Sequence, residues 1–325
     1  MSDRFNPLHY LDKRLINENP ITKAIFGLSS HLAKRKSEFQ FFNFIVTNEK
    51  GIIHSDIKIS TIKNDNTLEY KIDEHNNKIF WLRINHCDND ILETIVLPKG
   101  AILIHEDISL NKSSKETTIN CLGNNSYYYL SLHLHEQLFF NKVKFLINNN
   151  VKSYFFTLEH AQKHKNQIDY QLTKESKLEH YSLSSIQKGQ LQDDSINVVH
   201  DKNSNSKVVY QSLNKGKVVS QVNSLVEKES IGCSTEQNLK HIVLEKTAIT
   251  NSKPNLMICN NDIVASHGNS IGSFNNEELF YLNQRGLTKE QAYTVLANSI
   301  IENYLSNTDI KDELINYLKG KELYV

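Results

Sequence analysis

A long succession of short strand-like segments constrains this chain more than any other feature of its sequence. From Phe39 to Leu244, runs rich in Ile, Val, Phe and Tyr alternate with Asn, Asp, Gly and Lys, and no convincing amphipathic helix interrupts them. Pro98 is the one proline of this region, and the Asn-Gly and Asp-Gly pairs typical of tight hairpins are absent from it. The pattern predicts a mainly β protein.

Three architectures fit so many short strands without helices: a sandwich, a propeller and a β-helix. A propeller should show a periodic blade signature, which the sequence lacks. The lack of hairpin turns weakens the sandwich, whereas a β-helix joins its strands through short polar corners. Periodicity alone therefore gives the β-helix a modest lead and leaves the other two architectures open.

One strand-like segment, residues 127–135, alternates clearly. Tyr128 and Leu130 are expected to face the core, while Tyr127, His133 and His135 face water or are half exposed. His133 and His135 share one face, as metal ligands might be placed, but no third ligand is evident nearby. The pattern favours hydrogen-bonded or solvent-facing histidines over a metal site.

Helical patterns lie on both sides of the strand region. Near the start, leucines recur at helical spacing, which predicts a helical segment over residues 1–38. Near the end, Asn275 can cap a helix that closes at Gly286. Thr288 then begins a capping box for a helix with Ala292 and Val295 on its apolar face, and a last helix is expected over residues 309–319.

These patterns divide the chain into three predicted parts. Residues 1–38 form an N-terminal helical segment, residues 39–274 form the strand core, and residues 275–325 form a C-terminal helical domain. The apolar faces of the C-terminal helices must pack on the strand core, on each other or on a partner protein.

Charge and composition exclude several classes of protein. The chain of 325 residues carries 37 basic and 37 acidic side chains, and this balance argues against a nucleic-acid binder that depends on a basic field. No apolar run approaches the roughly 18 to 20 residues that span a bilayer, and the first residues lack an apolar signal core. We therefore expect a cytoplasmic protein that binds neither nucleic acid nor membrane.

The four cysteines are far apart and form no C-x-x-C pair. They are Cys87, Cys121, Cys233 and Cys259. A disulfide framework is not expected in so long a chain with so few cysteines, and free cysteines in the core are the favoured interpretation.

The densest signal is the stretch from Ser252 to Gly286, where the strand pattern gives way to helices. Cys259 and His267 are expected to flank a turn at the end of the strand region. Thiolate and imidazole suit iron and sulfur chemistry. Composition alone favours a buried cysteine and a histidine that caps a loop.

Other motifs in the chain carry little chemistry. Residues 268–272 resemble a phosphate-binding loop only in their glycines, because the following Lys and Ser/Thr are missing. The paired carboxylates Asp193-Asp194 and Glu277-Glu278 are neighbours in sequence, and such neighbours usually diverge. None of these motifs predicts an active site.

The segment from Asn261 to Gly272, followed by Glu278 to Gly286, strongly resembles the C-terminal signature of the SufB/SufD family. Members of this family are components of the Suf iron–sulfur cluster assembly scaffold. Ser266-His267-Gly268 is similar to the SufD branch, since the SufB branch carries Glu beside its His. The resemblance is strong over the last ninety residues or so and weaker from about residue 90 onward.

The resemblance implies a right-handed parallel β-helix flanked by helical N- and C-terminal parts. It implies that the β-helix pairs with SufB and that the C-terminal helices bind the SufC ATPase, and the isolated chain could form a homodimer. It places Ser266, His267 and Gly268 at the SufB-facing interface, where a cluster forms transiently and His267 could ligate iron.

The same resemblance assigns a SufC-facing surface to the first C-terminal helix. Its predicted residues are Phe280, Tyr281, Arg285 and Gly286. No catalytic residue and no permanently bound cofactor is expected, because ATP hydrolysis would belong to SufC. Cys259 has no family role that carries over and is expected in the core.

Two other functions stay open. A SufB-like homodimer could carry a cluster on its own cysteines without a partner. A β-helix enzyme acting on polysaccharide is the more distant alternative, since such enzymes need clustered carboxylates and arginines along a groove and the strand region contains few arginines.

Overall fold

In a computed structural model, the strands form two sheets. The structure describes residues 42–306 and residue 308, with the exception of the segments 49–50, 56–58, 65–66, 73–78, 87–90, 110–113, 134–137 and 160–161. Sheet A contains β1 (Phe42–Asn48), β2 (Gly51–Ser55), β5 (Ile79–His86), β7 (Ile102–Ser109), β9 (Asn125–His133), β11 (Asn150–Glu159), β13 (Lys177–Ile186), β15 (Asn205–Asn214), β17 (Cys233–Val243) and β19 (Ile263–Gly272). Sheet B contains β3 (Ile59–Asn64), β4 (Thr67–Ile72), β6 (Ile91–Leu97), β8 (Ser114–Cys121), β10 (Leu138–Ile147), β12 (Lys163–Leu172), β14 (Leu191–His200), β16 (Lys217–Val226) and β18 (Ile249–Ile258).

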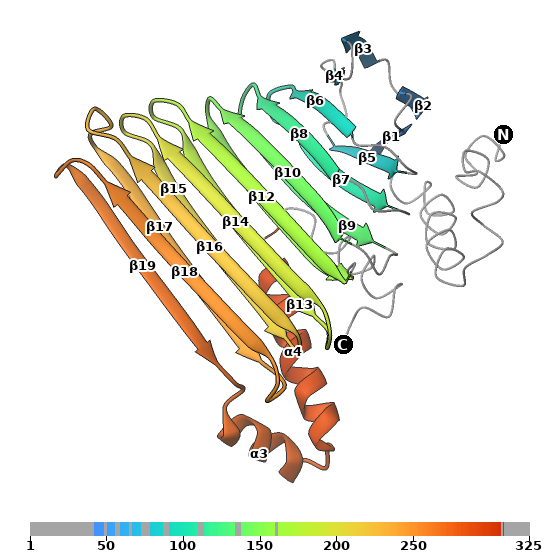
Figure 1. Ribbon diagram of the computed structural model, residues 1–325, viewed down its shortest axis with the longest axis vertical. Coiled ribbons are helices and arrows are strands. Elements are labelled where there is room, and N and C mark those ends of the chain that lie inside the picture. Colours follow the sequence, from blue (N-terminus) through green and yellow to red (C-terminus); the bar gives the residue numbers. More distant parts are fainter. Residues whose placement is uncertain are drawn as a thin grey trace. The chain divides into compact units, whose positions relative to one another are not determined.

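From β4 onward the chain alternates between the two sheets, so each strand pairs with the strand two positions further along the sequence. From β4 and β5 onward the neighbours are parallel, as in β10 with β12 and β17 with β19 (Figure 1). This is a parallel β-solenoid, and it confirms the predicted β-helix against the sandwich and the propeller. Its right-handed coiling stays a prediction.

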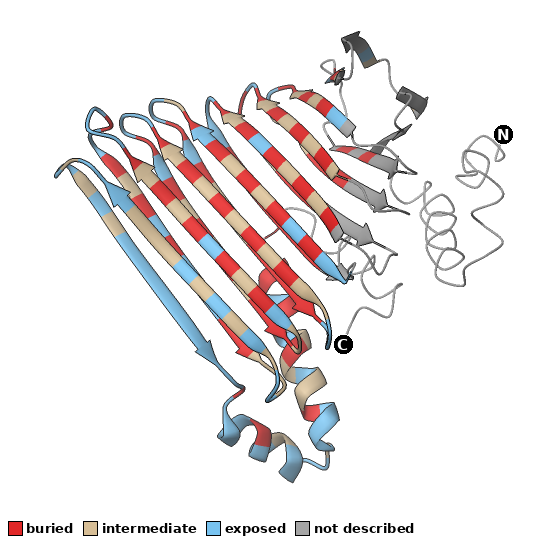
Figure 2. Ribbon diagram, in the orientation of Figure 1, coloured by how far each residue is buried: buried red, intermediate tan, exposed pale blue. Residues whose placement is uncertain are grey.

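The interior of the solenoid is filled by alternate residues of every coil. In β14 the burial pattern alternates strictly along all ten residues, and β8, β12 and β16 behave alike. Figure 2 shows this alternation as red and tan steps along the strands. A single apolar cluster fills the interior, from Tyr70 to Leu239.

The faces of β9 are the reverse of the prediction. Tyr127 lies in the interior cluster, whereas Tyr128 lies outside that cluster. Tyr128 is also fully buried and stacks on Tyr154, with 4.7 Å between ring centroids, and Tyr154 stacks on Tyr181 at 5.2 Å. Because tyrosines occupy both faces, hydrophobicity alone could not identify the inner one. The side chain of His133, and all of His135, lie outside the described residues.

The corners between coils are held by stacked main-chain hydrogen bonds. Glu175, Asn203 and Gly232 have positive φ angles of 62°, 56° and 71°. Each donates its N–H to a main-chain oxygen in the corner of the following coil, at 2.9 Å. Short polar corners of this kind replace the hairpin turns that the sequence lacks.

In the described part of the chain, two helices follow β19. Helix α3 (Asn276–Gln284) is capped by Asn275, whose side chain accepts from the N–H of Glu277, and it ends at Gly286 with φ 89°. Helix α4 (Lys289–Leu305) begins with the predicted Thr288–Gln291 capping box. Its apolar face differs from the prediction, because Val295 is exposed while Ala297 and Ile301 are buried.

The chain divides into two compact units. One is the solenoid, residues 41–272, and the other contains α3 and α4. The predicted N-terminal helical segment and the last predicted helix, residues 309–319, lie outside the described residues. No helix within the described part of the chain combines the length and the apolar character of a membrane span. The cytoplasmic location stays a prediction.

Candidate functional site

The candidate site is the last coil of the solenoid, made by β18 and β19. These strands end the strand order of sheets B and A, so each has one neighbour and one free edge. A free edge presents main-chain N–H and C=O groups that can pair with another chain. In Figure 2 β19 is almost wholly pale blue, unlike the strands β10, β12, β14 and β16. This coil is therefore open where the others are covered.

His267 lies in the middle of β19, not at a turn as the sequence indicated. It pairs in register with Gln237, whose side chain is buried in the interior. The side chains of residues that pair in register in parallel strands point to the same side of the sheet, so His267 belongs to the row of inward-facing residues, here called the inward file. It is nevertheless exposed, because no further coil covers it. The imidazole therefore lines the open end of the solenoid.

Ser266 and Gly268 flank His267 on the opposite face of β19. They pair with Glu236 and Asn238, which are outward-facing and exposed. A Cβ atom at Gly268 would meet only the Asn238 Oδ1, at 4.0 Å, so space within the chain does not require glycine there. The structure thus separates the three predicted interface residues onto two faces of one strand.

Two asparagines fix the geometry of the last coil. Asn269, in the same inward file as His267, donates from Nδ2 to the main-chain oxygen of Ser252 in β18 at 3.3 Å. Asn260 holds the turn between β18 and β19 by donating to the main-chain oxygens of Glu227 at 2.8 Å and Ser230 at 3.1 Å. The turn that connects the two edge strands is therefore held in place by side-chain hydrogen bonds.

Cys259 corrects the sequence interpretation. It directly follows β18 and is exposed, whereas Cys121 and Cys233 are buried as predicted. Burial raises the pKa of the Cys121 thiol to about 12, so that thiol stays protonated at neutral pH. Cys87 lies outside the described residues. Of the described cysteines, Cys259 is thus the one a reactant could reach.

The predicted SufC-facing residues lie on and just after α3. Phe280 and Tyr281 are 64% and 56% exposed, unusually high for large apolar side chains. The Arg285 guanidinium lies 5.2 Å from the centre of the Tyr281 ring, a cation–π contact that holds both groups in place. Gly286 ends the helix in a left-handed conformation, with its N–H donated to the oxygen of Asn283.

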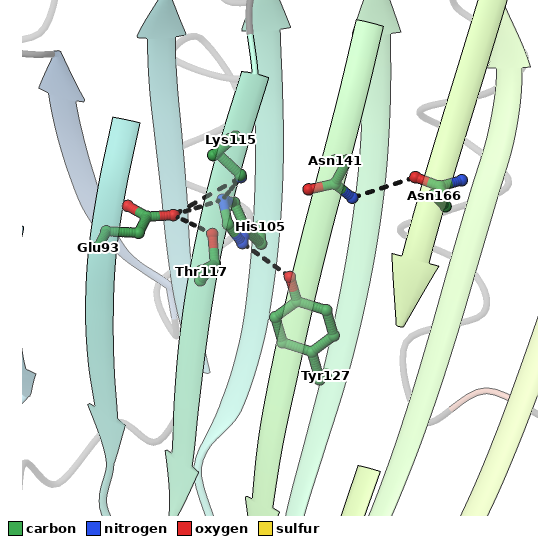
Figure 3. Close-up of polar contacts among 7 residues, drawn as sticks. All are labelled: Glu93, His105, Lys115, Thr117, Tyr127, Asn141 and Asn166. Carbon is green, nitrogen blue, oxygen red and sulfur yellow. Dashed lines mark hydrogen bonds and ion pairs between the residues drawn. The ribbon is translucent and has the colours of Figure 1, made fainter. Parts of the chain in front are cut away.

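A buried polar cluster inside the solenoid was missed by the sequence analysis (Figure 3). Lys115 Nζ donates to His105 Nε2 at 2.8 Å and lies 3.6 Å from Glu93 Oε1. Thr117 donates to the same carboxylate oxygen at 2.6 Å. Since Lys115 can only donate, His105 Nε2 accepts, and its Nδ1 carries the proton toward the Tyr127 oxygen at 2.7 Å.

A file of polar side chains continues from this cluster along sheet B. Lys115 is in register with Asn141, Asn141 with Asn166, and Asn166 with Asp194. Asn141 donates to Asn166 at 3.1 Å, as Figure 3 shows, and Asn166 donates to Asp194 at 2.8 Å. Burial raises the pKa of Asp194 to about 6. The signal in the sequence that could have revealed this cluster is Lys115, a charged residue at a position of β8 that the alternating pattern turns inward.

Among the described residues, no group of three or more His, Cys, Asp or Glu side chains is arranged to hold a metal ion. His267 can therefore supply one ligand, and the described chain does not complete a site around it. A surface cavity of about 390 Å³ lies elsewhere, at the corners that begin β7, β9, β11 and β13, and its charged lining residues are Lys152, Lys177 and Glu179. Lys177 and Glu179 already pair at 2.7 Å.

Comparison with known proteins identifies a family. Residues 112–300, more than half of the chain, match the family described as SUF system FeS cluster assembly, SufBD core domain. The chain is 33% identical over 103 residues to the chloroplastic protein ABCI7 of Arabidopsis thaliana, covering 30% of this chain and 21% of that protein. It is 35% identical over 83 residues to an iron–sulfur cluster assembly SufBD family protein of Mycobacterium leprae, covering 25% of this chain and 21% of that protein.

A third relative, the SufBD family protein ycf24 of Galdieria sulphuraria, is 28% identical over 127 residues, which covers 38% of this chain and 57% of that protein. The chain thus spans between about one fifth and just over half of the length of these relatives.

Proposed function

Since the chain belongs to the SufB/SufD family of the SUF iron–sulfur cluster assembly system, we propose that it is a SufD-type scaffold subunit. In this proposal it pairs with SufB through the open end of its solenoid and binds the SufC ATPase through its C-terminal helices. It catalyses no reaction itself, and ATP hydrolysis belongs to SufC.

The observation that carries the proposal is the exposed last coil. Val264 and Ile271 in β19 are 75% and 51% exposed, and Met257 in β18 is 46% exposed. Exposed apolar side chains beside free strand edges favour a protein partner that extends both sheets. Covering them would remove apolar surface from water.

The cargo in this proposal is an iron–sulfur cluster assembled transiently at the joint with SufB. The exposed imidazole of His267 supports this role, because imidazole can ligate iron or transfer a proton near neutral pH. The remaining ligands would come from the partner. In this proposal the iron–sulfur cluster is cargo that the two chains bind transiently, and it is not a permanent cofactor.

Substitution of His267 tests this role. His267→Ala should lower cluster maturation in the assembled complex at least tenfold while leaving SufB and SufC binding unchanged. Lys240→Ala is the matched control, because Lys240 is an exposed, outward-facing residue of the neighbouring strand β17. Equal maturation by the His267→Ala complex and the wild-type complex would remove His267 from the proposal.

Deletion of residues 276–325 tests the SufC surface. The exposed Phe280 and Tyr281 on α3 support this assignment. The truncated chain should lose co-purification with SufC and keep pairing with SufB. If SufC bound the truncated chain as well as the full chain, the C-terminal helices would not be its binding surface.

A SufB-like homodimer is the second candidate, and the exposure of Cys259 is the observation that favours it. Anaerobic reconstitution of the lone chain separates the two. Stable stoichiometric cluster on the isolated protein, abolished by Cys259→Ala and retained by Cys233→Ala, would favour the homodimer. The SufD-type proposal expects no stoichiometric cluster on the lone chain.

A further inference from the structure

An asparagine ladder crosses the outer face of sheet B and ends at the free edge. Asp169, Asn197, Asn223 and Asn255 occupy β12, β14, β16 and β18, and each is in register with the next. Asn197 donates to Asp169 at 2.6 Å, Asn223 donates to Asn197 at 2.7 Å, and Asn255 donates to Asn223 at 2.8 Å. One side chain per coil thus links the last four strands of the sheet.

The ladder has a fixed direction because one end is a carboxylate. Asp169 accepts from Asn197 and also from Gln167 Nε2 at 2.9 Å, and an ionised carboxylate cannot donate. Asn197 must therefore turn its NH₂ toward Asp169 and its oxygen toward Asn223. Asn223 and Asn255 have the same amide orientation, with the NH₂ toward the preceding residue of the ladder. The last rung, Asn255, presents its Oδ1 away from β16, toward the free edge.

The main chain at this point also presents an acceptor without a donor. Ile249 donates its N–H to the main-chain oxygen of Gly216, directly before β16, and Cys259 donates its N–H to that of Val226, the last residue of β16, at 2.9 Å each. Main-chain groups of successive residues in a parallel strand point to opposite sides, and the register here is unbroken. Pro254 therefore faces the free edge, where it has a C=O and no N–H.

We infer that the β18 edge selects a partner strand that brings hydrogen-bond donor side chains, such as Asn, Gln, Lys or Arg, opposite Pro254 and Asn255. This inference rests on the proposed pairing with SufB and names what the partner strand must offer. Two adjacent acceptors and no donor make this part of the edge complementary to donors alone.

The same argument disfavours a second copy of this chain in the symmetric register. If β18 paired with its own copy so that Asn255 faced Asn255, two Oδ1 atoms would meet. Relief would require one amide to reverse and break its bond to Asn223. The ladder therefore acts as a specificity element that favours a different partner over self-pairing.

Substitutions at Asn255 test the inference, with purified SufB from the same organism as the probe and the dissociation constant as the readout. Asn255→Leu removes the outward acceptor and should weaken binding about 3- to 10-fold, the range expected for one net hydrogen bond. Asn255→Asp loses the donation to Asn223 Oδ1, which still accepts from Gln221 Nε2 at 3.1 Å, but it keeps an outward acceptor and should stay within about threefold of the wild type by the same measure. Asn251→Leu is the matched control, because Asn251 is an exposed asparagine on the same face of β18 outside the ladder.

The outcomes separate the inference from the function on which it rests. No binding of SufB by the wild-type chain would overturn the proposed pairing and the inference with it. Binding by the wild type with equal affinity for Asn255→Leu, or an equal loss for Asn255→Leu and Asn255→Asp, would overturn the inference alone. Self-association of the lone chain that Asn255→Leu abolishes would assign the edge to a second copy and also overturn it. Thermal unfolding of each variant confirms that it folds.

Discussion

Replacing Lys115 by methionine should destabilise the solenoid strongly, because the substitution removes one partner of a buried ion pair. The Lys115 and Glu93 side chains are essentially inaccessible to water. Methionine fills a similar volume without a charge, so Glu93 would lose its cationic partner and keep only its contacts with Thr117 and His105. No described group hydrogen-bonds to its second carboxylate oxygen.

The distances set the size of the effect. At 3.6 Å between Lys115 Nζ and Glu93 Oε1, Coulomb's law with an effective dielectric constant of about 20 gives about 4–5 kcal/mol. Breaking a buried pair by removing one partner typically costs about 3–5 kcal/mol. For a unit of this size, that corresponds to a fall of about 10 °C in the unfolding midpoint.

Thermal unfolding followed by far-UV circular dichroism measures the shift. Lys142→Met is the matched control, because Lys142 pairs with Glu116 at 2.8 Å on the neighbouring strand but both side chains are partly exposed. A surface pair of this kind is worth about 0–1 kcal/mol. Adding Glu93→Gln to Lys115→Met should recover much of the loss, because the uncompensated charge is gone. Equal midpoints for Lys115→Met and Lys142→Met would refute the reasoning.

Burial lowers the pKa of three interior histidines, to about 3 for one and about 4 for the other two, below the roughly 6.5 of an unfolded chain. These are His180, His200 and His241. Because the unfolded chain binds these protons first, the free energy of unfolding should fall as the pH drops from about 6.5 toward 4, and a flat series of urea midpoints would contradict this. Asp194 acts in the opposite sense: burial raises its pKa to about 6, so the folded form binds its proton first, and Asp194→Asn should steepen the acid loss. Gly216→Ala would bring a Cβ into a clash with the main-chain oxygen of Gln187 and should cost about 1–3 kcal/mol in denaturant unfolding, whereas Gly272→Ala, with open space around it, should cost little.

The sequence predicted the strands of the solenoid better than their arrangement. Alternation within each segment is a local signal, but Thr117 and its neighbour Glu93 are 24 residues apart, and Asn255 and Asn223 are 32 apart. Local patterns do not encode such pairings, and the family resemblance supplied only the parallel β-helix architecture in which they occur. The last two strands escaped the strand pattern because Ser266-His267-Gly268 lacks the β-branched residues that mark a strand with one covered face.

The sequence selected candidate site residues, whose roles stay predictions, but it did not give their positions in space. The resemblance selected His267, yet nothing local showed that it lies within a strand and in the inward file. Cys259 follows the apolar run Leu256-Met257-Ile258, which is typical of a buried strand, but the open last coil leaves it exposed. Interior charges such as Lys115 were missed because a period-two pattern reads a lysine as outward-facing.

The stacking of coils also sets the order in which the molecule can be built. Each coil completes its hydrogen bonds on the coil before it, and the strands that pair lie only a few tens of residues apart. A chain that emerges from the ribosome with its N-terminal end first can therefore add coils one at a time. Of the described strands, β19, which carries His267, is the last to find its neighbour, so the edge to which we assign partner binding forms only when the rest of the solenoid is in place. In the proposed pairing, incomplete chains would lack that edge and could not compete for the partner.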